Sequence, residues 1–159
     1  MKNIITQLSF MAFFLLVSAC ASYHRLMIGP DGSVQDCYAT GQGIIGMASA
    51  SKYANECADN LKRLGYIEIE QAGAVGITFR IDSAYALKVE PNSPADKVGI
   101  KGGDKIIEIN NVEVVSAKDA IMLLFGEAGT ELSITYQRGV NRFSSKLVRA
   151  FYTELYGRP

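Results

Sequence analysis

The chain has 159 residues with 16 basic and 16 acidic side chains, so its formal net charge is zero. Lysine and arginine are scattered along it, which excludes the concentrated positive surface that nucleic-acid binding requires. The hydrophobic share of 48% is typical of a globular protein, and the length suffices for one ordinary domain or for a small unit beside one.

The first 19 residues predict a secretory signal peptide. One positive charge, Lys2, precedes an apolar run over residues 10–17. This run is shorter than the ~20 apolar residues that a membrane span needs. We therefore expect residues 1–19 to direct export and not to cross the membrane.

The end of this leader, Val17-Ser18-Ala19-Cys20, resembles a bacterial lipobox. The resemblance implies that Cys20 becomes the first residue of the mature protein and carries lipid such as palmitate. Ala21 and Ser22 follow it, which favours the outer over the inner membrane. The alternative is an ordinary signal cleaved nearby, with Cys20 incidental.

Residues 20–33 are expected to form a lipidated tether with a turn at Gly29-Pro30-Asp31-Gly32. The tether contains the only histidine, His24. No cysteine, aspartate or second histidine lies at ligand spacing from it, so the pattern favours a solvated linker residue. The sequence predicts no metal site and no cofactor.

Residues 34–70 predict a small strand-helix-strand unit. A strand is expected over 34–38 and a glycine-rich loop over 41–46, whose spacing fits no nucleotide-binding fingerprint. From Met47 apolar residues recur at helical spacing until Gly65 ends the helix, and residues 66–69 suggest a strand. The expected apolar helix face consists of Ala50, Tyr53, Ala54, Cys57, Ala58, Leu61 and Leu64.

With Cys20 lipidated, Cys37 and Cys57 remain as an even pair in an oxidising compartment, where pairing is the rule. A disulfide would close a loop of about 20 residues and contribute roughly 3 kcal/mol in the chain-entropy model. Such a bridge suits a unit too small to bury much core. Free buried thiols are the alternative, and a redox-active pair is disfavoured because no C-x-x-C is present.

Residues 71–150 place several demanding signals in order. Gly76-Ile77-Thr78-Phe79 opens a strand in which apolar and polar residues alternate as far as Asp82. Ser93 is placed to cap a short helix that Pro94 opens and Gly99 ends. Residues 102–104 then turn the chain into an apolar strand over 106–109.

The rest of this region predicts a tight turn, a helix and a hairpin. Asn110-Asn111 suits the turn, and Val112, Val114 and Val115 are expected to extend the sheet. Ser116 is placed to cap a helix that ends at Gly126 or Gly129. Alternation over 132–137 and 143–149 predicts a terminal hairpin. The aromatic tail, residues 151–159, is expected to be a frayed terminus with a few docked rings; filling its own groove is the alternative.

This order of a G-I-x-F loop, a strand, an S-P-A-x-x-x-G-I-x-x-G-D turn and a strand closing on Ile109-Asn110 resembles a PDZ domain of the bacterial, protease-associated kind. The resemblance covers residues 71–150. It implies an α+β fold, a partly open PDZ-like β-barrel or sandwich with two helices, preceded here by the small disulfide-tied α/β unit.

The resemblance also implies a mode of binding. A peptide, usually with a free C-terminus, would lie between residues 79–83 and the helix near 117–124 and extend the sheet by main-chain hydrogen bonds. The amides of residues 77–79 would face its carboxylate. Family members that select serine or threonine two residues from the end of the peptide have a histidine at the position of Ala117. With alanine there, an apolar peptide residue is expected. The implied peptide-binding residues are Gly76, Ile77, Thr78, Phe79, Arg80, Ile81, Ala117, Ile121 and Leu124; for several of them simple core packing is the alternative.

Proteases of this family place a catalytic triad before the PDZ domain or a Ser/Lys dyad after it. Here residues 34–70 contain no histidine and only about ten residues follow Arg149, so neither arrangement fits. We therefore expect a non-enzymatic lipoprotein of the cell envelope, facing the periplasm at the outer membrane. It would bind a protein or peptide partner, with no nucleic acid and no small-molecule substrate. The alternative is an assembly subunit of an envelope complex whose groove stays empty and whose sheet edge pairs with another subunit or copy.

Overall fold

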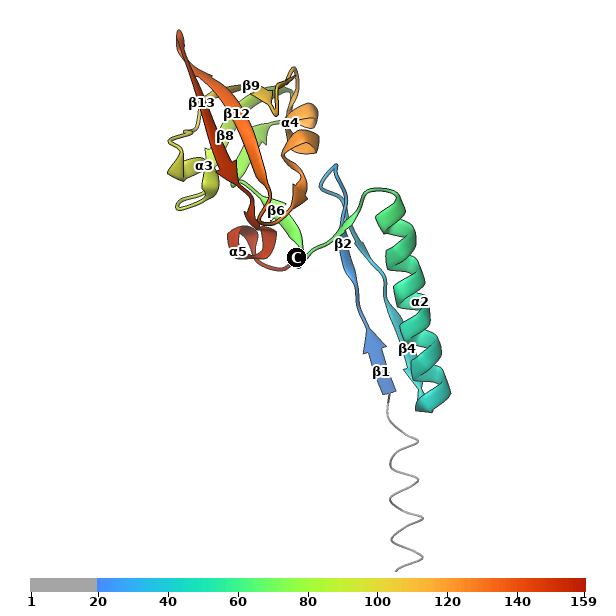
Figure 1. Ribbon diagram of the computed structural model, residues 1–159. Coiled ribbons are helices and arrows are strands. Elements are labelled where there is room, and N and C mark those ends of the chain that lie inside the picture. Colours follow the sequence, from blue (N-terminus) through green and yellow to red (C-terminus); the bar gives the residue numbers. More distant parts are fainter. Residues whose placement is uncertain (1–19) are drawn as a thin grey trace, which may run out of the picture. The chain divides into compact units, whose positions relative to one another are not determined.

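The computed structural model describes residues 20–159 (Figure 1). The signal peptide predicted for residues 1–19 lies outside the described residues. The described chain divides into two compact units. The first contains residues 20–27 and 34–64, and the second contains residues 28–33 and 65–159. No helix within residues 20–159 combines the length and the apolar character of a membrane span.

The first unit is a long helix on a pair of antiparallel strands. Strand β1 (Cys20–Tyr23) pairs with β4 (Ala39–Gln42), with Cys20 opposite Gln42. In chain order, β2 (Leu26–Ile28) and β3 (Val34–Asp36) come between β1 and β4, and α2 (Gly43–Arg63) follows β4 directly. Strands β1 and β2 thus occupy much of residues 20–33, for which the sequence predicts a tether, and the predicted turn follows β2.

The glycine-rich segment over residues 41–46 is not the loop that the sequence predicts. β4 reaches Gln42, and α2 begins at Gly43 with a positive φ of 66°. A Cβ atom on Gly41 would lie 2.0 Å from the backbone oxygen of Gly46. The glycines therefore allow the first turn of the helix to lie directly against the strand that precedes it.

The buried face of α2 is narrower than expected. Ala50, Ala54 and Ala58 are buried at a spacing of one turn and face β4 and β1. Tyr53 and Leu64, which the pattern assigned to this face, are exposed. Alanine brings the helix close to a support only two strands wide, which leaves no room for larger side chains beneath it. Gly65 follows the helix with a φ of 86°, as predicted.

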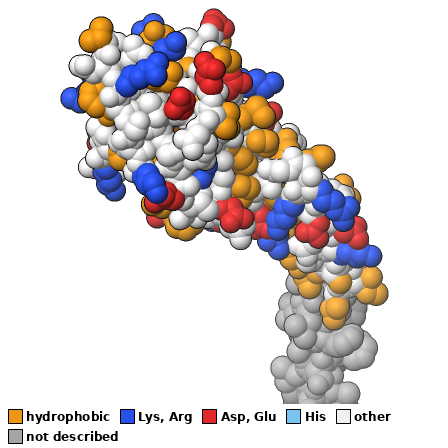
Figure 2. Space-filling view, turned by 45° about the horizontal axis from the view of Figure 1, so that its top comes forward, with side chains coloured by type: hydrophobic (Ala, Val, Ile, Leu, Met, Phe, Trp, Pro, Cys, Tyr) orange, Lys and Arg blue, Asp and Glu red, His pale blue; other side chains and the backbone are white. Residues whose placement is uncertain are grey.

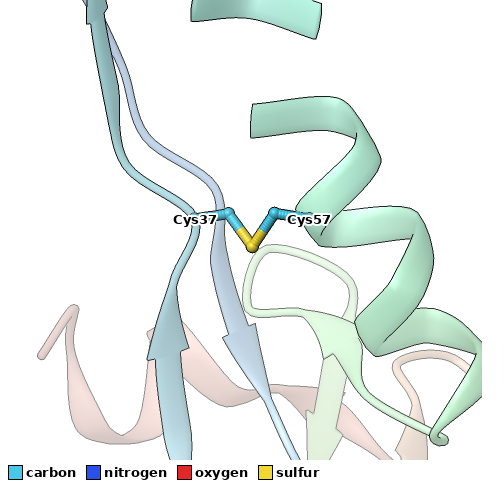
Figure 3. Close-up of a disulfide and its surroundings, with 2 residues drawn as sticks. All are labelled: Cys37 and Cys57. Carbon is cyan, nitrogen blue, oxygen red and sulfur yellow. A yellow bond between two sulfur atoms is a disulfide. The ribbon is translucent and has the colours of Figure 1, made fainter. Parts of the chain in front are cut away.

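The disulfide between Cys37 and Cys57 is confirmed (Figure 3). It joins the segment between β3 and β4 to the second half of α2, and Cys37 is buried. Nearby, the Nδ1 atom of the exposed His24 lies 3.1 Å from Oδ2 of Asp36, and its ring packs on Tyr38. His24 thus has local partners between two strands and does not lie in a free linker.

The second unit contains an antiparallel sheet in the order β13-β12-β9-β8-β7, with β10 paired to β9. The strands are β7 (Ile77–Arg80), β8 (Ser83–Val89), β9 (Lys105–Ile109), β10 (Val112–Glu113), β12 (Glu131–Arg138) and β13 (Asn141–Val148). A smaller sheet has the order β11-β6-β14, formed by β11 (Gly126–Glu127), β6 (Ala72–Ala74) and β14 (Ala150–Phe151). The short strand β5 (Ile67–Glu68) precedes them.

Three helices complete this unit: α3 (Pro94–Lys97), α4 (Ala117–Leu124) and α5 (Tyr152–Tyr156). The core packs strand residues such as Ile106, Ile109 and Ile134 against Ala120 and Leu124 of α4. Helix α4 contacts β8 and β9 (Figure 1). This α+β arrangement confirms the expected fold class.

The turn predictions are confirmed, whereas several element ends differ. Asn110 and Asn111 both have positive φ, and the terminal hairpin forms as β12 and β13. β10 stops at Glu113, so Val115 does not extend the sheet and is exposed. Helix α4 ends at Leu124, earlier than expected, because the backbone at Phe125 is already extended and leads into β11. The tail forms α5 in place of a frayed end.

Candidate functional site

A groove runs between β7 and α4 in the second unit. β8 pairs with one edge of β7, and within residues 20–159 no strand pairs with its other edge. Beside that free edge lies a cavity of about 590 Å³. Seven of the nine predicted peptide-binding residues line it: Ile77, Thr78, Phe79, Arg80, Ile81, Ala117 and Ile121.

The two remaining predicted residues, Gly76 and Leu124, line a second cavity of about 130 Å³ at the end of the groove. Ile77 and Ile121 line both cavities, so the two adjoin. All nine residues are thus brought together along one path. Ile81 differs in detail: it lies past the end of β7 and is almost fully exposed, so it belongs to the mouth of the groove and not to a strand.

The loop before β7 is held in a conformation that only glycine adopts easily. Gly76 has a φ of 82°, and a Cβ atom on it would lie 2.3 Å from Cβ of Ser93. Its carbonyl accepts a hydrogen bond of 2.8 Å from the amide of Glu90. Both the backbone angle and the close contact therefore require glycine at this end of the groove.

The S-P-A segment fixes the same loop from the other side. Ser93 is fully buried, and its hydroxyl accepts a hydrogen bond from the amide of Asp96, which caps α3. The amide of Ala95 donates to the carbonyl of Val75 at 3.0 Å. Two sequence motifs that lie apart in the chain thus form one device, in which a capped helix holds the loop that opens β7.

The other wall of the groove, α4, is fixed at its N-terminus by a capping box. The hydroxyl of Ser116 accepts a hydrogen bond from the amide of Asp119 at 3.1 Å, and the Asp119 carboxylate accepts one from the amide of Ser116 at 3.0 Å. Ala117 follows directly and is buried on the groove side. The cap therefore positions the first groove residue of the helix.

The C-terminus of α4 is held by Arg149, a buried cation that sequence reasoning placed only in a strand. Its guanidinium donates to the carbonyls of Leu124 at 2.7 Å, Leu123 at 3.2 Å and Phe125 at 3.2 Å, and to the hydroxyl of Thr130 at 2.7 Å. Burial lowers the pKa of Arg149. A positive charge at the carbonyl end of a helix is electrostatically favourable.

Four residues with ionisable side chains that the sequence did not assign to the site also line these cavities. Asp31 and Lys118 line the groove, and Tyr152 and Tyr156 of α5 line the end cavity. The hydroxyl and amide of Ser33 hydrogen-bond the carboxylate of Asp31 and lower its pKa. Asp31, Tyr152 and Tyr156 belong to a turn and a tail, for which the sequence carries no spacing signal, whereas Lys118 follows Ala117 on α4.

Partial burial raises the pKa of Tyr156, which is 40% exposed, to about 12, with a further contribution from the charge of Glu90. The ring of Tyr156 packs on that of Tyr152 with centroids 4.9 Å apart. Because both tyrosines line the end cavity with Leu124 and Phe125, the floor of the groove at this end is largely apolar.

The chemistry that the groove offers is that of binding. It presents a free strand edge, apolar side chains and a few charged groups at its mouth. Among residues 20–159 no group of three or more histidine, cysteine, aspartate or glutamate side chains could hold a metal ion. An extended peptide fits such a site, because the strand edge supplies main-chain donors and acceptors and the pockets take alternate side chains.

Residues 85–138, from β8 to the end of β12, match the family model of the PDZ domain. The second unit, which contains these residues, has the fold of a PDZ domain. Domains of this kind are generally modules that bind peptides or protein C-termini.

Two curated relatives contain a similar region. The human PDZ domain-containing protein 4 is 32% identical over 103 residues, which cover 56% of this chain and 13% of that protein. The mouse E3 ubiquitin-protein ligase PDZRN3 is 33% identical over 86 residues, which cover 49% and 8%. The chain thus spans only a small part of the length of these relatives.

Three solved structures are similar to parts of the chain. A photosystem II D1 C-terminal processing protease has a TM-score of 0.48 and 27% identity, covering 52% of this chain and 24% of that one. An HtrA-type protease with a decapeptide has a TM-score of 0.49 and 17% identity, covering 69% and 35%. A serine endoprotease from Yersinia pestis has a TM-score of 0.46 and 16% identity, covering 81% and 61%.

Proposed function

We propose that the protein is a non-enzymatic, lipid-anchored envelope protein whose PDZ groove binds an extended peptide by adding it as a strand to β7. The observation that carries this proposal is the path along the free edge of β7, where all nine predicted residues line two adjoining cavities. Main-chain hydrogen bonds to the edge would supply affinity, and the cavities would select side chains.

The preferred ligand is a protein tail with an apolar last residue. The end cavity, bounded by Ile121, Leu124 and Phe125, would take that side chain. The amides of the loop that follows Gly76 would face the terminal carboxylate, as fixed dipoles that need no cationic side chain. At the start of α4, Ala117 offers a methyl group and no hydrogen-bond donor, which favours an apolar residue further back in the peptide.

The proposed anchor is lipid on Cys20. In support, Cys20 is exposed, its thiol is free, and it begins β1 directly after a sequence that resembles a lipobox. Residues 21 and 22 favour the periplasmic face of the outer membrane. Metabolic labelling with a fatty acid, together with the mass of the N-terminal peptide, tests this part: an unmodified Cys20 in cells that acylate other lipoproteins would refute it.

Binding itself is tested by screening the chain from residue 21 onward against peptides with free or amidated C-termini. Free peptides with an apolar last residue should bind, and amidation should weaken them. Ile121→Asp should abolish binding because the side chain lines both cavities. Met122→Asp is the matched control, since Met122 is exposed on the same helix and lines neither cavity.

The alternative is a subunit that uses the edge of β7 for assembly and leaves the groove empty. Ala117→Glu and Ile121→Asp would then leave complex formation intact. If no peptide binds more tightly than about millimolar, roughly 4 kcal/mol, tail recognition fails and the assembly role becomes the better account.

A further inference from the structure

One end of the first unit has an exposed apolar tip, formed by Ile44 and Ile45 at the start of α2. Their side chains are 75% and 83% exposed. Single exposed hydrophobic residues are ordinary on protein surfaces, but two adjacent isoleucines at the end of a helix are a stronger signal. The two isoleucines do not belong to the packed face of α2, because the buried residues of that helix are all alanine.

The same end of the unit carries no charge. Residues 20–23 of β1 and residues 39–51, which comprise β4 and the first turns of α2, contain no aspartate, glutamate, lysine or arginine. The first charged side chain on α2 is Lys52. At 1.5 Å per residue it lies about 12 Å along the helix from Ile44. Figure 2 shows hydrophobic side chains at the end where the described residues begin, and charged ones farther along.

The register of the strands brings Cys20 to this tip. Cys20 pairs with Gln42, and Ile44 follows two residues later. Paired Cα atoms lie ~5 Å apart and consecutive ones 3.8 Å, so the Cα atoms of Cys20 and Ile44 are separated by no more than about 13 Å. A lipid on Cys20 would therefore enter the membrane close to the two isoleucines.

We propose that Ile44 and Ile45 insert into the lipid leaflet in which Cys20 is anchored, so that the tip is a membrane-contact surface. The inference rests on the proposed lipid anchor. A bilayer surface fits better than a protein partner for two reasons. The apolar tip adjoins Cys20, the proposed lipid-bearing residue, and its charge-free length of about 12 Å is enough to enter the ~5–10 Å layer in which interfacial helices bury their apolar face.

The absence of tryptophan from the chain permits a direct test. Ile45→Trp places a fluorescent probe at the tip, and Tyr53→Trp places the matched control eight residues along the same helix, where the native side chain is 63% exposed beside Lys52. Each full-length protein is produced in cells, purified and reconstituted into vesicles of phosphatidylethanolamine and phosphatidylglycerol with brominated acyl chains. The probe at position 45 should emit at shorter wavelength and be quenched several-fold more than the probe at position 53.

A second variant guards against the preference of tryptophan itself for interfaces. Ile44→Asp, added to Ile45→Trp, should remove most of the quenching, because a carboxylate next to the probe opposes insertion. Equal quenching at positions 45 and 53 would overturn the inference. A blue-shifted probe at position 45 that brominated lipid does not quench would also overturn it, since protein and not lipid would then cover the tip.

The mass of the N-terminal peptide from the same samples separates this inference from the anchor. If the protein is acylated and the probe at position 45 is not quenched, insertion of the tip is refuted and the lipid anchor stands. If the protein is not acylated and the probe is quenched, the lipid anchor is refuted and contact of the tip with the membrane is supported. If the protein is neither acylated nor quenched, both proposals fall.

Discussion

Replacing Arg149 with methionine should destabilise the second unit and weaken peptide binding together. Arg149 is 7% exposed, and its guanidinium holds the last carbonyls of α4, the helix that forms one wall of the groove. Methionine keeps much of the aliphatic volume but donates no hydrogen bond. The substitution therefore tests the polar contacts more than the packing.

The expected magnitude follows from the four hydrogen bonds. The bond to the carbonyl of Leu124 is buried and charge-assisted, and it contributes about 1.5–3 kcal/mol. The three bonds to Leu123, Phe125 and Thr130 are partly exposed and contribute about 0.5–1 kcal/mol each. Because these contributions are not additive and water will reach some of the carbonyls, we expect a loss of about 3 kcal/mol.

Urea denaturation followed by circular dichroism measures this loss. With a slope of about 1–3 kcal/mol per M urea, the midpoint should fall by about 1–3 M. Arg142→Met is the matched control, because Arg142 is exposed on β13 and should change stability by no more than about 0.5 kcal/mol. A loss below about 1 kcal/mol for Arg149→Met would refute the argument, since the guanidinium would then not hold the helix end.

Three further predictions concern stability and titration. Asp104 is 1% exposed and accepts two hydrogen bonds of 2.7 Å from Arg138, so Asp104→Asn should lower the free energy of unfolding by about 2 kcal/mol. A double-mutant cycle with Arg138→Met should show coupling between the two residues, and additive losses would contradict the prediction. Cys37→Ser with Cys57→Ser should lower the stability of the first unit by about 3 kcal/mol in thermal unfolding, and reductant should reproduce that loss in the wild type but not in the variant. The pKa of Tyr156 is raised to about 12 from ~10 in the unfolded chain, so the folded state favours the neutral phenol, and stability should fall as pH rises between these values. In an ultraviolet titration, one tyrosine of the wild type should ionise late, and Tyr156→Phe should lose that late transition. A variant that keeps it would contradict the prediction.

The groove could be predicted from the sequence because its determinants are local. Gly76 needs a positive φ, Ser93 caps α3, and Ser116 caps α4. Each signal lies within a few residues of the element that it controls, and strand alternation sets the core side. The order of these signals along the chain therefore predicts both the fold and the residues that line the groove.

The first unit was harder to predict, because β1 and β4 pair across a long stretch of chain and neither has a strong strand pattern. Cys20–Tyr23 and Ala39–Gln42 contain small and polar residues that favour no particular structure. The breadth of the helix face was overestimated for a related reason. Periodicity shows which residues can share a face, whereas the width of the two-stranded support decides how many are buried.

The contacts that shape the groove are separate from the surfaces that would touch a ligand. The Ser93-Pro94-Ala95 segment fixes the loop at Gly76 through the hydrogen bond from Ala95 to Val75, and Arg149 fixes α4 through its carbonyls. Because both walls are held by such contacts, little backbone ordering remains to oppose binding. Selectivity can then change through the lining side chains alone, and substitutions at the fixing residues should lower affinity for all peptides alike.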